Sequence, residues 1–360
     1  MEVWEKVFVN DAEFLQSTHG KVGCVICHGG DSRNGKKEQA HAGLVADPSD
    51  GNCNTCHQDV AHANAISLHA TLSGFESALE ARGGNVAEGS PLATALENHC
   101  QACHTTCGQC HVSRPDELDG GLVSGHEFRG TPSMQYNCIA CHGSRVGDEY
   151  LGNNSGIPGD IHWLKGGMTC SDCHSQELHG SGKMLDTRYH NPDIVKCEDC
   201  HTDVWTNTEG NPQHEQHLSD LSCQVCHSIA YKNCYGCHVS IDPEGLPCRT
   251  SEPSVMQFEI GLNPLRSCER AYKYVVLRHV PTCVGTCDYY GENLFPDFNS
   301  VPTWKYATPH NIQLSTPQNE SCDACHGNIE LFLTEEDIRP EEKEANKDVI
   351  VDEIPETTGK

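Results

Sequence analysis

The chain has 360 residues, a formal net charge of −27 and 24 cysteines. This negative charge excludes binding to nucleic acid or anionic lipid through phosphate contacts, because such binding depends on clustered Lys and Arg. Hydrophobic residues make up only 36% of the chain and aromatic residues 6%, with 33 glycines and 18 prolines. That composition is too polar for the large side-chain core of an ordinary protein of this length. We therefore expect something other than side chains to fill the interior.

Apolar runs in the sequence are short. None approaches the roughly 18 to 20 residues that are needed to cross a bilayer. The first 20 residues carry acids and no apolar segment, so they do not read as a secretory signal. We expect no membrane span in this chain and, if the protein is exported, a signal that has already been removed.

Twenty of the 24 cysteines belong to ten copies of one motif, Cys-x-x-Cys-His. Two cysteines three positions apart can each form a thioether with one vinyl group of a haem, and the next histidine can bind the iron. The motifs therefore predict ten covalently bound c-type haems. The expected thioether cysteines are Cys24, Cys27, Cys53, Cys56, Cys100, Cys103, Cys107, Cys110, Cys138, Cys141, Cys170, Cys173, Cys197, Cys200, Cys223, Cys226, Cys234, Cys237, Cys322 and Cys325. The expected proximal iron ligands are His28, His57, His104, His111, His142, His174, His201, His227, His238 and His326.

Two other uses of paired cysteines fit the motif less well. Zinc sites need two Cys-x-x-Cys pairs for each ion and do not require a histidine after every second cysteine. A disulfide framework does not require that histidine either.

The motifs use ten of the 23 histidines and leave 13 others, whereas methionine, the other common sixth ligand, occurs only five times. We therefore expect a second histidine on most or all irons. Two such ligands keep iron low-spin and leave no open site for a substrate, which favours electron transfer over catalysis. The expected distal ligands are His19, His41, His62, His69, His126, His162, His179, His190, His217 and His310. His99 and His214 are alternates, and His279 ranks below the others.

The motifs form an internal repeat of five haems. The fifth and tenth motifs both read Cys-x-Ala-Cys-His-Gly, and each follows another histidine by twelve positions. The third and fourth motifs are nearly fused, as are the eighth and ninth, so the third matches the eighth and the fourth matches the ninth. We expect one pentahaem module at residues 1–145 and a second at 146–240, completed by the tenth haem segment at 310–329.

A haem-free insert, residues 241–309, separates the ninth motif from the tenth. It contains the four remaining cysteines, Cys248, Cys268, Cys283 and Cys287. Their even number in an oxidising compartment predicts two disulfide bonds, whose connectivity stays open.

Outside the motifs, periodic patterns are weak. Helices are expected at residues 73–82 and 91–98 and a strand at 273–278, with loops rich in Gly, Asn, Asp and Pro elsewhere. The acidic residues 330–360 are expected to form a solvated tail or a linker. The expected fold is mostly irregular, with short α-helices wrapped around a stack of c-type haems and β-strands in the haem-free insert.

Through these motifs, residues 19–327 resemble the multihaem (decahaem) c-type cytochromes of extracellular electron transfer. The resemblance implies maturation outside the cytoplasm, with a location in the periplasm, at the cell surface or outside the cell. It also implies conduction of electrons along bis-histidine haems. The implied partners are other redox proteins, copies of the chain itself in a filament, or a terminal acceptor such as a metal oxide or a partner cytochrome.

An alternative function is a multihaem oxidoreductase that reduces a nitrogen or sulfur oxyanion at a haem with an open site. The last haem segment, from His310 to His326, loosely resembles that of octahaem tetrathionate reductases. Those enzymes rely on a haem with an unusual or vacant axial position, and no Cys-x-x-Cys-Lys motif occurs here.

Overall fold

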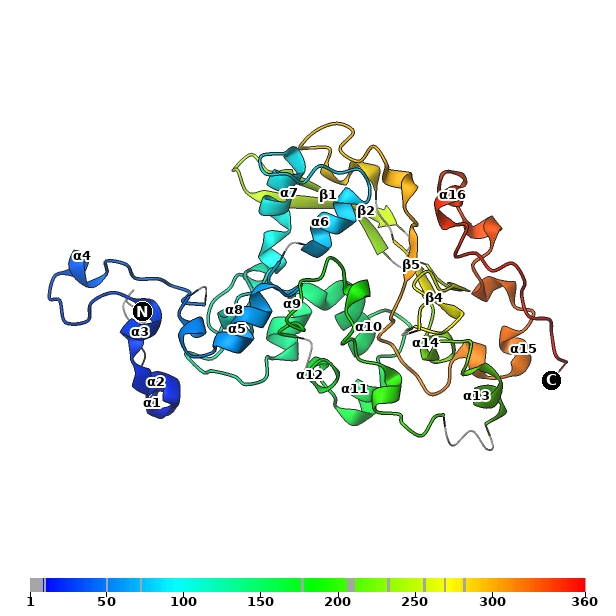
Figure 1. The fold of residues 1–360 in the computed structure, drawn as a ribbon, viewed down its shortest axis with the longest axis horizontal. Helices are drawn as coiled ribbons and strands as arrows, with labels where there is room; N and C mark the ends of the chain where they lie inside the picture. The colour runs from blue at the N-terminus through cyan, green and yellow to red at the C-terminus, as the bar shows by residue number, and fades with distance from the viewer. Residues whose placement is uncertain are drawn as a thin grey trace. The chain divides into compact units, whose positions relative to one another are not determined.

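The structure is a computed structural model that describes residues 9, 11–49, 51–71, 73–175, 178–205, 211–231, 234–254, 257–268, 270–280 and 283–359. Short helices are joined by long irregular segments (Figure 1). The α-helices are α1 (Ala12–Gln16), α2 (Thr18–Val22), α3 (Cys24–His28), α4 (Lys37–Ala40), α5 (Gln58–Ala65), α6 (Ser73–Glu80), α7 (Pro91–His99), α8 (Cys107–His111), α9 (Ile139–His142), α10 (Asp148–Leu151), α11 (Ile161–Gly166), α12 (Cys170–Cys173), α13 (Pro212–His217), α14 (Cys223–His227), α15 (Cys322–Cys325) and α16 (Lys343–Asn346). Among the described residues, no helix is both long enough and apolar enough to cross a bilayer.

Five strands form two small antiparallel sheets. The strands are β1 (Cys234–Ile241), β2 (Pro247–Ser254), β3 (Phe258–Leu262), β4 (Tyr274–His279) and β5 (Trp304–Tyr306). One sheet pairs β1 with β2, and the other has the order β3-β4-β5. The expected helices are present as α6 and α7, and the expected strand is present as β4.

The chain folds into two compact units, each made of separate segments. Unit 1 comprises Met1–Gly74, Cys100–Gly143 and Thr169–Ile194, and unit 2 comprises the segments Phe75–His99, Ser144–Met168 and Val195–Lys360. Unit 1 therefore carries the first six haem motifs and unit 2 the last four. These units do not coincide with the modules expected at 1–145 and 146–240, because the sixth motif packs with the first five.

Unit 1 lacks an apolar protein core. None of its described Ala, Val, Leu, Ile, Met, Phe, Tyr or Trp side chains is buried, and Val25, Ile26 and Val60 are exposed. Its buried side chains are polar, such as Gln109 and Asn137. Hydrophobic burial within the protein alone therefore cannot be the main stabilising term in this unit.

Unit 2, in contrast, has a side-chain core around β4. Val275 and Leu277 are fully buried and pack in one cluster with Trp304. The intervening Val276 packs in a second cluster with Phe258 of β3. Successive side chains of a strand point to opposite faces, so the central strand buries both of its faces.

The C-terminal segment is part of this core, so the expected solvated tail at residues 330–360 is wrong over much of its length. The Leu333 N–H donates to the Ile260 carbonyl at 2.8 Å, and the Leu262 N–H donates to the Val349 carbonyl at 2.9 Å. Leu333 and Val349 are buried. Most acidic side chains of this segment are exposed, whereas a few widely spaced apolar side chains are buried. The average composition of the segment therefore did not predict its burial.

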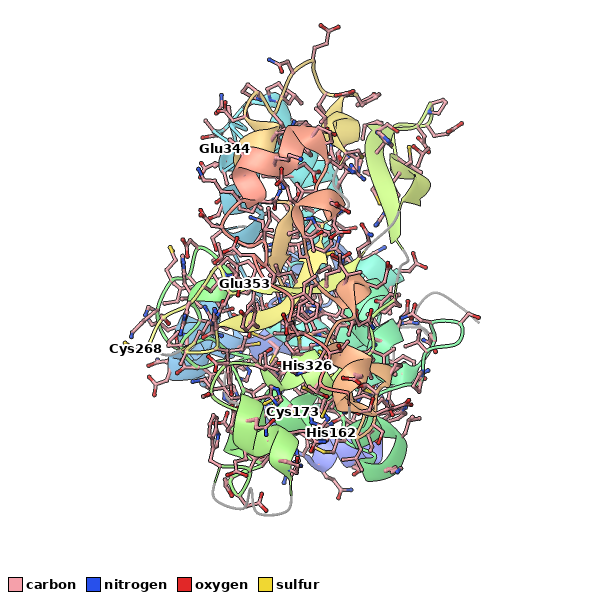
Figure 2. The ribbon with its side chains drawn as sticks, turned by 90° about the vertical axis from the view of Figure 1, so that its right-hand side faces the viewer. His162, Cys173, Cys268, His326, Glu344 and Glu353 are labelled. Atoms are coloured by element: carbon pink, nitrogen blue, oxygen red, sulfur yellow. The ribbon has the colours of Figure 1, made fainter. Side chains whose placement is uncertain are left out.

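The two expected disulfides are also absent. All four cysteines of the insert, Cys248, Cys268, Cys283 and Cys287, are free thiols. Cys248 lies in β2 beside Ser240 of β1, whereas Cys287 is buried in another cluster and Cys268 extends from an exposed loop (Figure 2). Cys248, Cys268 and Cys287 belong to different local environments, which their spacing in the sequence did not reveal.

The core of unit 2 predicts a large effect of cavity formation. Leu277→Ala should lower the free energy of unfolding of the haem-loaded protein by about 2–5 kcal/mol, because it leaves a cavity at a position with 0% exposure. Chemical denaturation followed by circular dichroism measures this change. Leu314→Ala is the matched control, since Leu314 is 73% exposed and its truncation should change stability by less than about 0.5 kcal/mol. Equal effects of the two substitutions would contradict the assigned core.

Candidate haem-binding sites

All ten motifs lie in the described part of the chain, and nine of them contain a helical turn. Examples are α3, α8 and α14, each of which spans a complete Cys-x-x-Cys-His sequence. In a helix, positions i, i+3 and i+4 share one face. The local fold therefore presents both sulfurs and the imidazole to the same side, as attachment of one haem edge requires.

The ninth motif differs, because Cys234, Cys237 and His238 lie in the extended strand β1. An extended backbone lacks the helical turn found in the other nine motifs, so this conformation does not fit a haem bound across both cysteines. The His238 ring instead contacts the insert, where its Nδ1 lies 3.1 Å from the Gly285 carbonyl. A haem at this motif requires the segment to leave the strand conformation.

The structure brings seven motif histidines together with seven histidines from outside the motifs. The pairs and their ring-centre separations are His57 with His19 (6.2 Å), His28 with His126 (6.0 Å), His142 with His69 (6.3 Å), His111 with His179 (6.0 Å), His201 with His162 (6.0 Å), His227 with His214 (6.1 Å) and His326 with His217 (6.0 Å). Each pair lies within one compact unit.

These separations fit two imidazoles on opposite sides of one iron. A metal–nitrogen bond of about 2.0 Å and a distance of about 1.1 Å from nitrogen to ring centre place the two centres about 6.2 Å apart. The angle between the ring planes varies from 10° for one pair to 82° for another. Direct ring packing would not produce one separation at such different angles, so a shared metal position explains the pairs better.

Hydrogen bonds on the outer side of the rings leave Nε2 available. In one pair, Nδ1 of His326 donates to the Glu356 carbonyl at 3.1 Å, and Nδ1 of His217 donates to the Gln213 carbonyl at 2.8 Å. Both Nε2 atoms therefore carry a lone pair, and neither can donate a hydrogen bond to the other. A cation between them satisfies both atoms, and the outer hydrogen bonds orient the rings as they do in other metal sites.

Burial favours the neutral form of several of these rings. Desolvation first, and the partner ring second, lower the pKa of His19, His126, His142 and His179. Neutral imidazole is the form that binds a metal, so these environments suit ligands.

Six of the ten expected distal histidines occur in these pairs, and the seventh partner is His214, which the sequence gave only as an alternate. His214 and His217 lie three positions apart on α13, on one helix face, and they face two different motifs. Pro212 is typical of the start of a helix, and a helix would place His214 and His217 on one face. This pattern could have ranked His214 among the expected distal ligands.

The other candidate histidines lie elsewhere. The remaining expected distal ligands, His41, His62, His190 and His310, are not among the seven pairs. Nδ1 of His190 lies 2.7 Å from an Asp186 carboxylate oxygen. The lower-ranked His99 and His279 contact other side chains, Tyr290 and Glu342.

Cysteines of different motifs also meet. Hydrogen bonding between their thiols raises the pKa of Cys53 beside Cys107, of Cys138 beside Cys170 and of Cys197 beside Cys223. Each contact joins the first cysteines of two motifs, whereas a structural zinc site needs four ligands. Among the described residues, the tightest such group is Cys197, Glu198 and Cys223, with ligand atoms within 4.8 Å of one another. These contacts therefore fit adjoining haem edges better than zinc.

A second kind of junction recurs three times, and we call it the histidine–asparagine junction. In each junction, the ring Nδ1 of a motif histidine donates to the backbone carbonyl of a second residue, and the N–H of that residue donates to the histidine carbonyl. The second residue lies eight or nine positions before another motif. The partners are His28 with Val45, His111 with Arg129 and His227 with Gln313. An asparagine near the start of that second motif donates its amide to the first motif, from Asn52 to the Cys27 carbonyl, from Asn137 to the Gln109 carbonyl and from Asn319 to the Cys226 carbonyl.

These junctions connect the first motif to the second, the fourth to the fifth and the eighth to the tenth. The eighth motif is therefore the structural counterpart of the fourth, and not of the third as the sequence spacing suggested. The spacing suggested the wrong match because the third motif lies just before the fourth, whereas the ninth motif lies just after the eighth.

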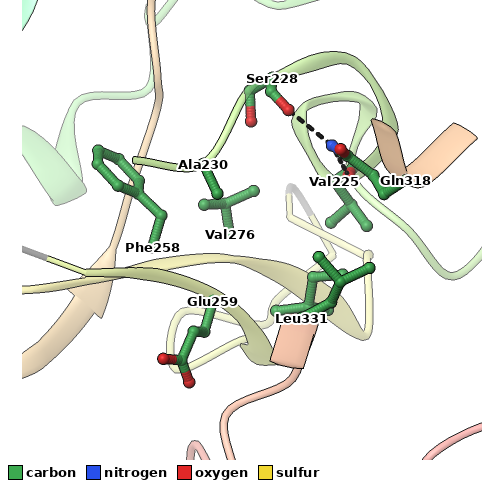
Figure 3. A pocket seen from close by; sticks show the side chains of 9 residues that line it. Val225, Ser228, Ala230, Phe258, Glu259, Val276, Gln318 and Leu331 are labelled. Carbon is green, nitrogen blue, oxygen red and sulfur yellow. Dashed lines mark hydrogen bonds between the residues drawn. The ribbon is translucent and has the colours of Figure 1, made fainter. Parts of the chain in front are cut away.

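An apolar cavity borders the eighth motif (Figure 3). Its lining includes Val225 from the middle of that motif, Phe258 of β3, Val276 of β4 and Leu331. The same core cluster packs against Cys226 and Cys325, the second cysteines of the eighth and tenth motifs. The side-chain core of unit 2 thus extends directly to two expected attachment sites.

Comparison with known proteins points in the same direction. The chain is 24% identical over 302 residues to the high-molecular-weight cytochrome c of Nitratidesulfovibrio vulgaris. The matched region covers 76% of this chain and 48% of that protein, so the chain spans about half of its length. No protein-family model matches the chain, and no solved structure matches it. That relative is a cytochrome c, and the Cys-x-x-Cys-His motifs of this chain independently predict covalent haem.

The position of His214 makes a specific prediction. If His214 and His227 bind one iron, His214→Ala should convert a single low-spin haem to a high-spin haem, which electron paramagnetic resonance of the oxidised protein detects. The control is His279→Gln, because His279 is buried against Glu342 and lies outside the seven pairs. This control should leave every haem low-spin. A low-spin spectrum for His214→Ala would refute the assignment.

Proposed function

We propose that this protein is a decahaem c-type cytochrome that conducts electrons along bis-histidine haems outside the cytoplasmic membrane. The observation that carries the proposal is the set of seven histidine pairs with ring centres 6.0–6.3 Å apart. Each pair joins a ligand predicted from a motif to a second histidine at the separation that one iron needs.

A c-type haem supplies an iron centre that accepts and releases one electron. The residues of this chain determine how that centre behaves. The two imidazoles of each pair would hold the iron and leave no position for a substrate, and outer hydrogen bonds such as that from His111 to the Arg129 carbonyl orient the rings. A site built in this way suits electron transfer rather than the binding and conversion of a small molecule.

The composition of unit 1 supports haems as its interior. Exposed apolar residues include Val25 and Ile26 within the first motif and Val60 after the second. A bound porphyrin would cover apolar surface of this kind and supply the burial that the polypeptide lacks. The fold expected from the sequence, a polypeptide wrapped around haems, thus remains our proposal for the loaded protein.

The partners that suit this function are other redox proteins, further copies of the chain, or a terminal acceptor such as a metal oxide. We place the protein in the periplasm, at the cell surface or outside the cell, because c-type haem attachment implies maturation outside the cytoplasm. A discrete carrier and a filament subunit would perform the same electron transfer, and electron microscopy of native extracellular material distinguishes them.

The purified, haem-loaded chain should carry ten covalent haems, counted by intact mass, and all should be low-spin in the oxidised state. The second axial histidine is the physical reason for the spin state. A substantial high-spin population would contradict conduction through fully ligated haems and would favour the alternative, an oxidoreductase acting on a nitrogen or sulfur oxyanion. A mass without covalent haem would overturn the proposal itself.

Loss of haem should affect the two units differently. In chain produced without haem attachment, protease should cleave first within the three segments of unit 1, because no described residue of that unit belongs to a buried hydrophobic cluster. The β3-β4-β5 region of unit 2 should resist longer, since Leu277 and Trp304 are buried there. The haem-loaded chain is the control, and equal cleavage of both units without haem would contradict this prediction.

A further inference from the structure

We propose that the haem attachment sites adjoin in an order that differs from their order in the sequence. The second site adjoins the fourth and the eighth adjoins the tenth, so the third and ninth sites lie beside the series instead of within it. The inference rests on the proposed function, because it assumes that haems occupy the sites.

The contact between the second and fourth motifs involves both their sulfurs and their backbones. The thiols of Cys53 and Cys107 hydrogen-bond to each other. The backbone N–H of Gly108, inside the fourth motif, donates to the Ser49 hydroxyl at 2.8 Å, shortly before the second motif. A Cβ atom at position 108 would lie only 2.7 Å from that hydroxyl oxygen, so any other residue here would displace the Ser49 side chain.

A second contact holds the same two motifs together. The Thr106 hydroxyl, directly before the fourth motif, donates to an Asp47 carboxylate oxygen at 2.9 Å. The two sulfurs are in contact, and these hydrogen bonds join the segments beside them. We infer that no other attachment site fits between the second and fourth motifs. The third site must therefore lie to one side of this junction.

The eighth and tenth motifs meet in the same direct way. The Cys226 carbonyl accepts hydrogen bonds from the Thr316 hydroxyl at 2.5 Å and from the Asn319 amide at 3.0 Å. Gln318 adds a hydrogen bond from its amide to the Val225 carbonyl at 3.1 Å. Both hydrogen-bonded carbonyls belong to the eighth motif, and all three donors directly precede the tenth. This junction excludes the ninth site from the space between them.

The remaining contacts complete two series, one in each unit. In unit 1, the histidine–asparagine junction joins the first motif to the second and the fourth to the fifth, and the thiols of Cys138 and Cys170 join the fifth to the sixth. In unit 2, the thiols of Cys197 and Cys223 lie within 4.8 Å of each other and join the seventh motif to the eighth. Sulfur contacts and histidine–asparagine junctions alternate along both series.

Thioether sulfurs attach to one edge of a haem, so sites whose sulfurs touch bring haem edges together. One electron can then pass between neighbouring irons, oxidising one and reducing the other, with no proton or further reactant. The direct route in unit 1 runs through the first, second, fourth, fifth and sixth sites, and in unit 2 through the seventh, eighth and tenth. The third and ninth sites become side branches.

An experimental structure of the haem-loaded full-length chain tests the order directly. The irons nearest to that of the fourth motif should belong to the second and fifth motifs, and the iron of the tenth should adjoin that of the eighth. An iron of the third motif between the second and fourth, or of the ninth between the eighth and tenth, overturns the inference and leaves the proposed function intact. Absence of covalent haem would instead overturn the function.

Two matched double variants test the same order in solution. Cys107→Ala with Cys110→Ala removes the fourth site, and Cys100→Ala with Cys103→Ala removes the third, so each chain should carry one haem fewer by mass. After pulse-radiolytic reduction, redistribution of electrons within the protein should slow by about an order of magnitude or more in the first variant, and clearly less in the second. Equal slowing, or the reverse pattern, contradicts the order.

Discussion

The structure depends on paired imidazole rings in which Nδ1 carries the hydrogen and Nε2 carries a lone pair. In the pair of His217 and His326, both Nδ1 atoms donate to backbone carbonyls, so each Nε2 carries a lone pair, and the ring centres lie 6.0 Å apart. Such an arrangement gains nothing from the protein alone and becomes favourable when a cation occupies the space. The seven pairs share one separation, which is the observation that carries the proposed iron sites.

This constraint explains why the two units differ. In unit 2, aliphatic residues on both faces of β4 form a core that needs no further component. Unit 1 buries polar side chains such as Asn137 and leaves its apolar side chains uncovered. Its segments are connected by hydrogen bonds that run between Cys-x-x-Cys-His motifs, so contacts between motifs and not a packed apolar interior define its architecture.

The sequence predicts the motifs and six of the histidines that lie beside motif histidines, because each prediction depends on residue type and short spacing. His214 was ranked too low because its value lies in its position on α13, which spacing from a cysteine does not express. The extended conformation of the ninth motif depends on pairing with β2, a contact between segments that the Cys-x-x-Cys-His pattern does not encode. Leu333 and Val349 were missed for a similar reason, since their burial depends on backbone pairing with β3 and not on the acidic composition around them.

The six-residue helix α13 carries His214 and His217, which we propose as ligands of two different irons. A shift of this helix would stretch two metal–nitrogen bonds together, so the eighth and tenth haems share a mechanical element as well as a chain junction. A partner that docks on α13, or a substitution that distorts it, would thus alter both reduction potentials at once. The proposed eighth and tenth haems, at the end of the series in unit 2, would therefore change their reduction potentials together.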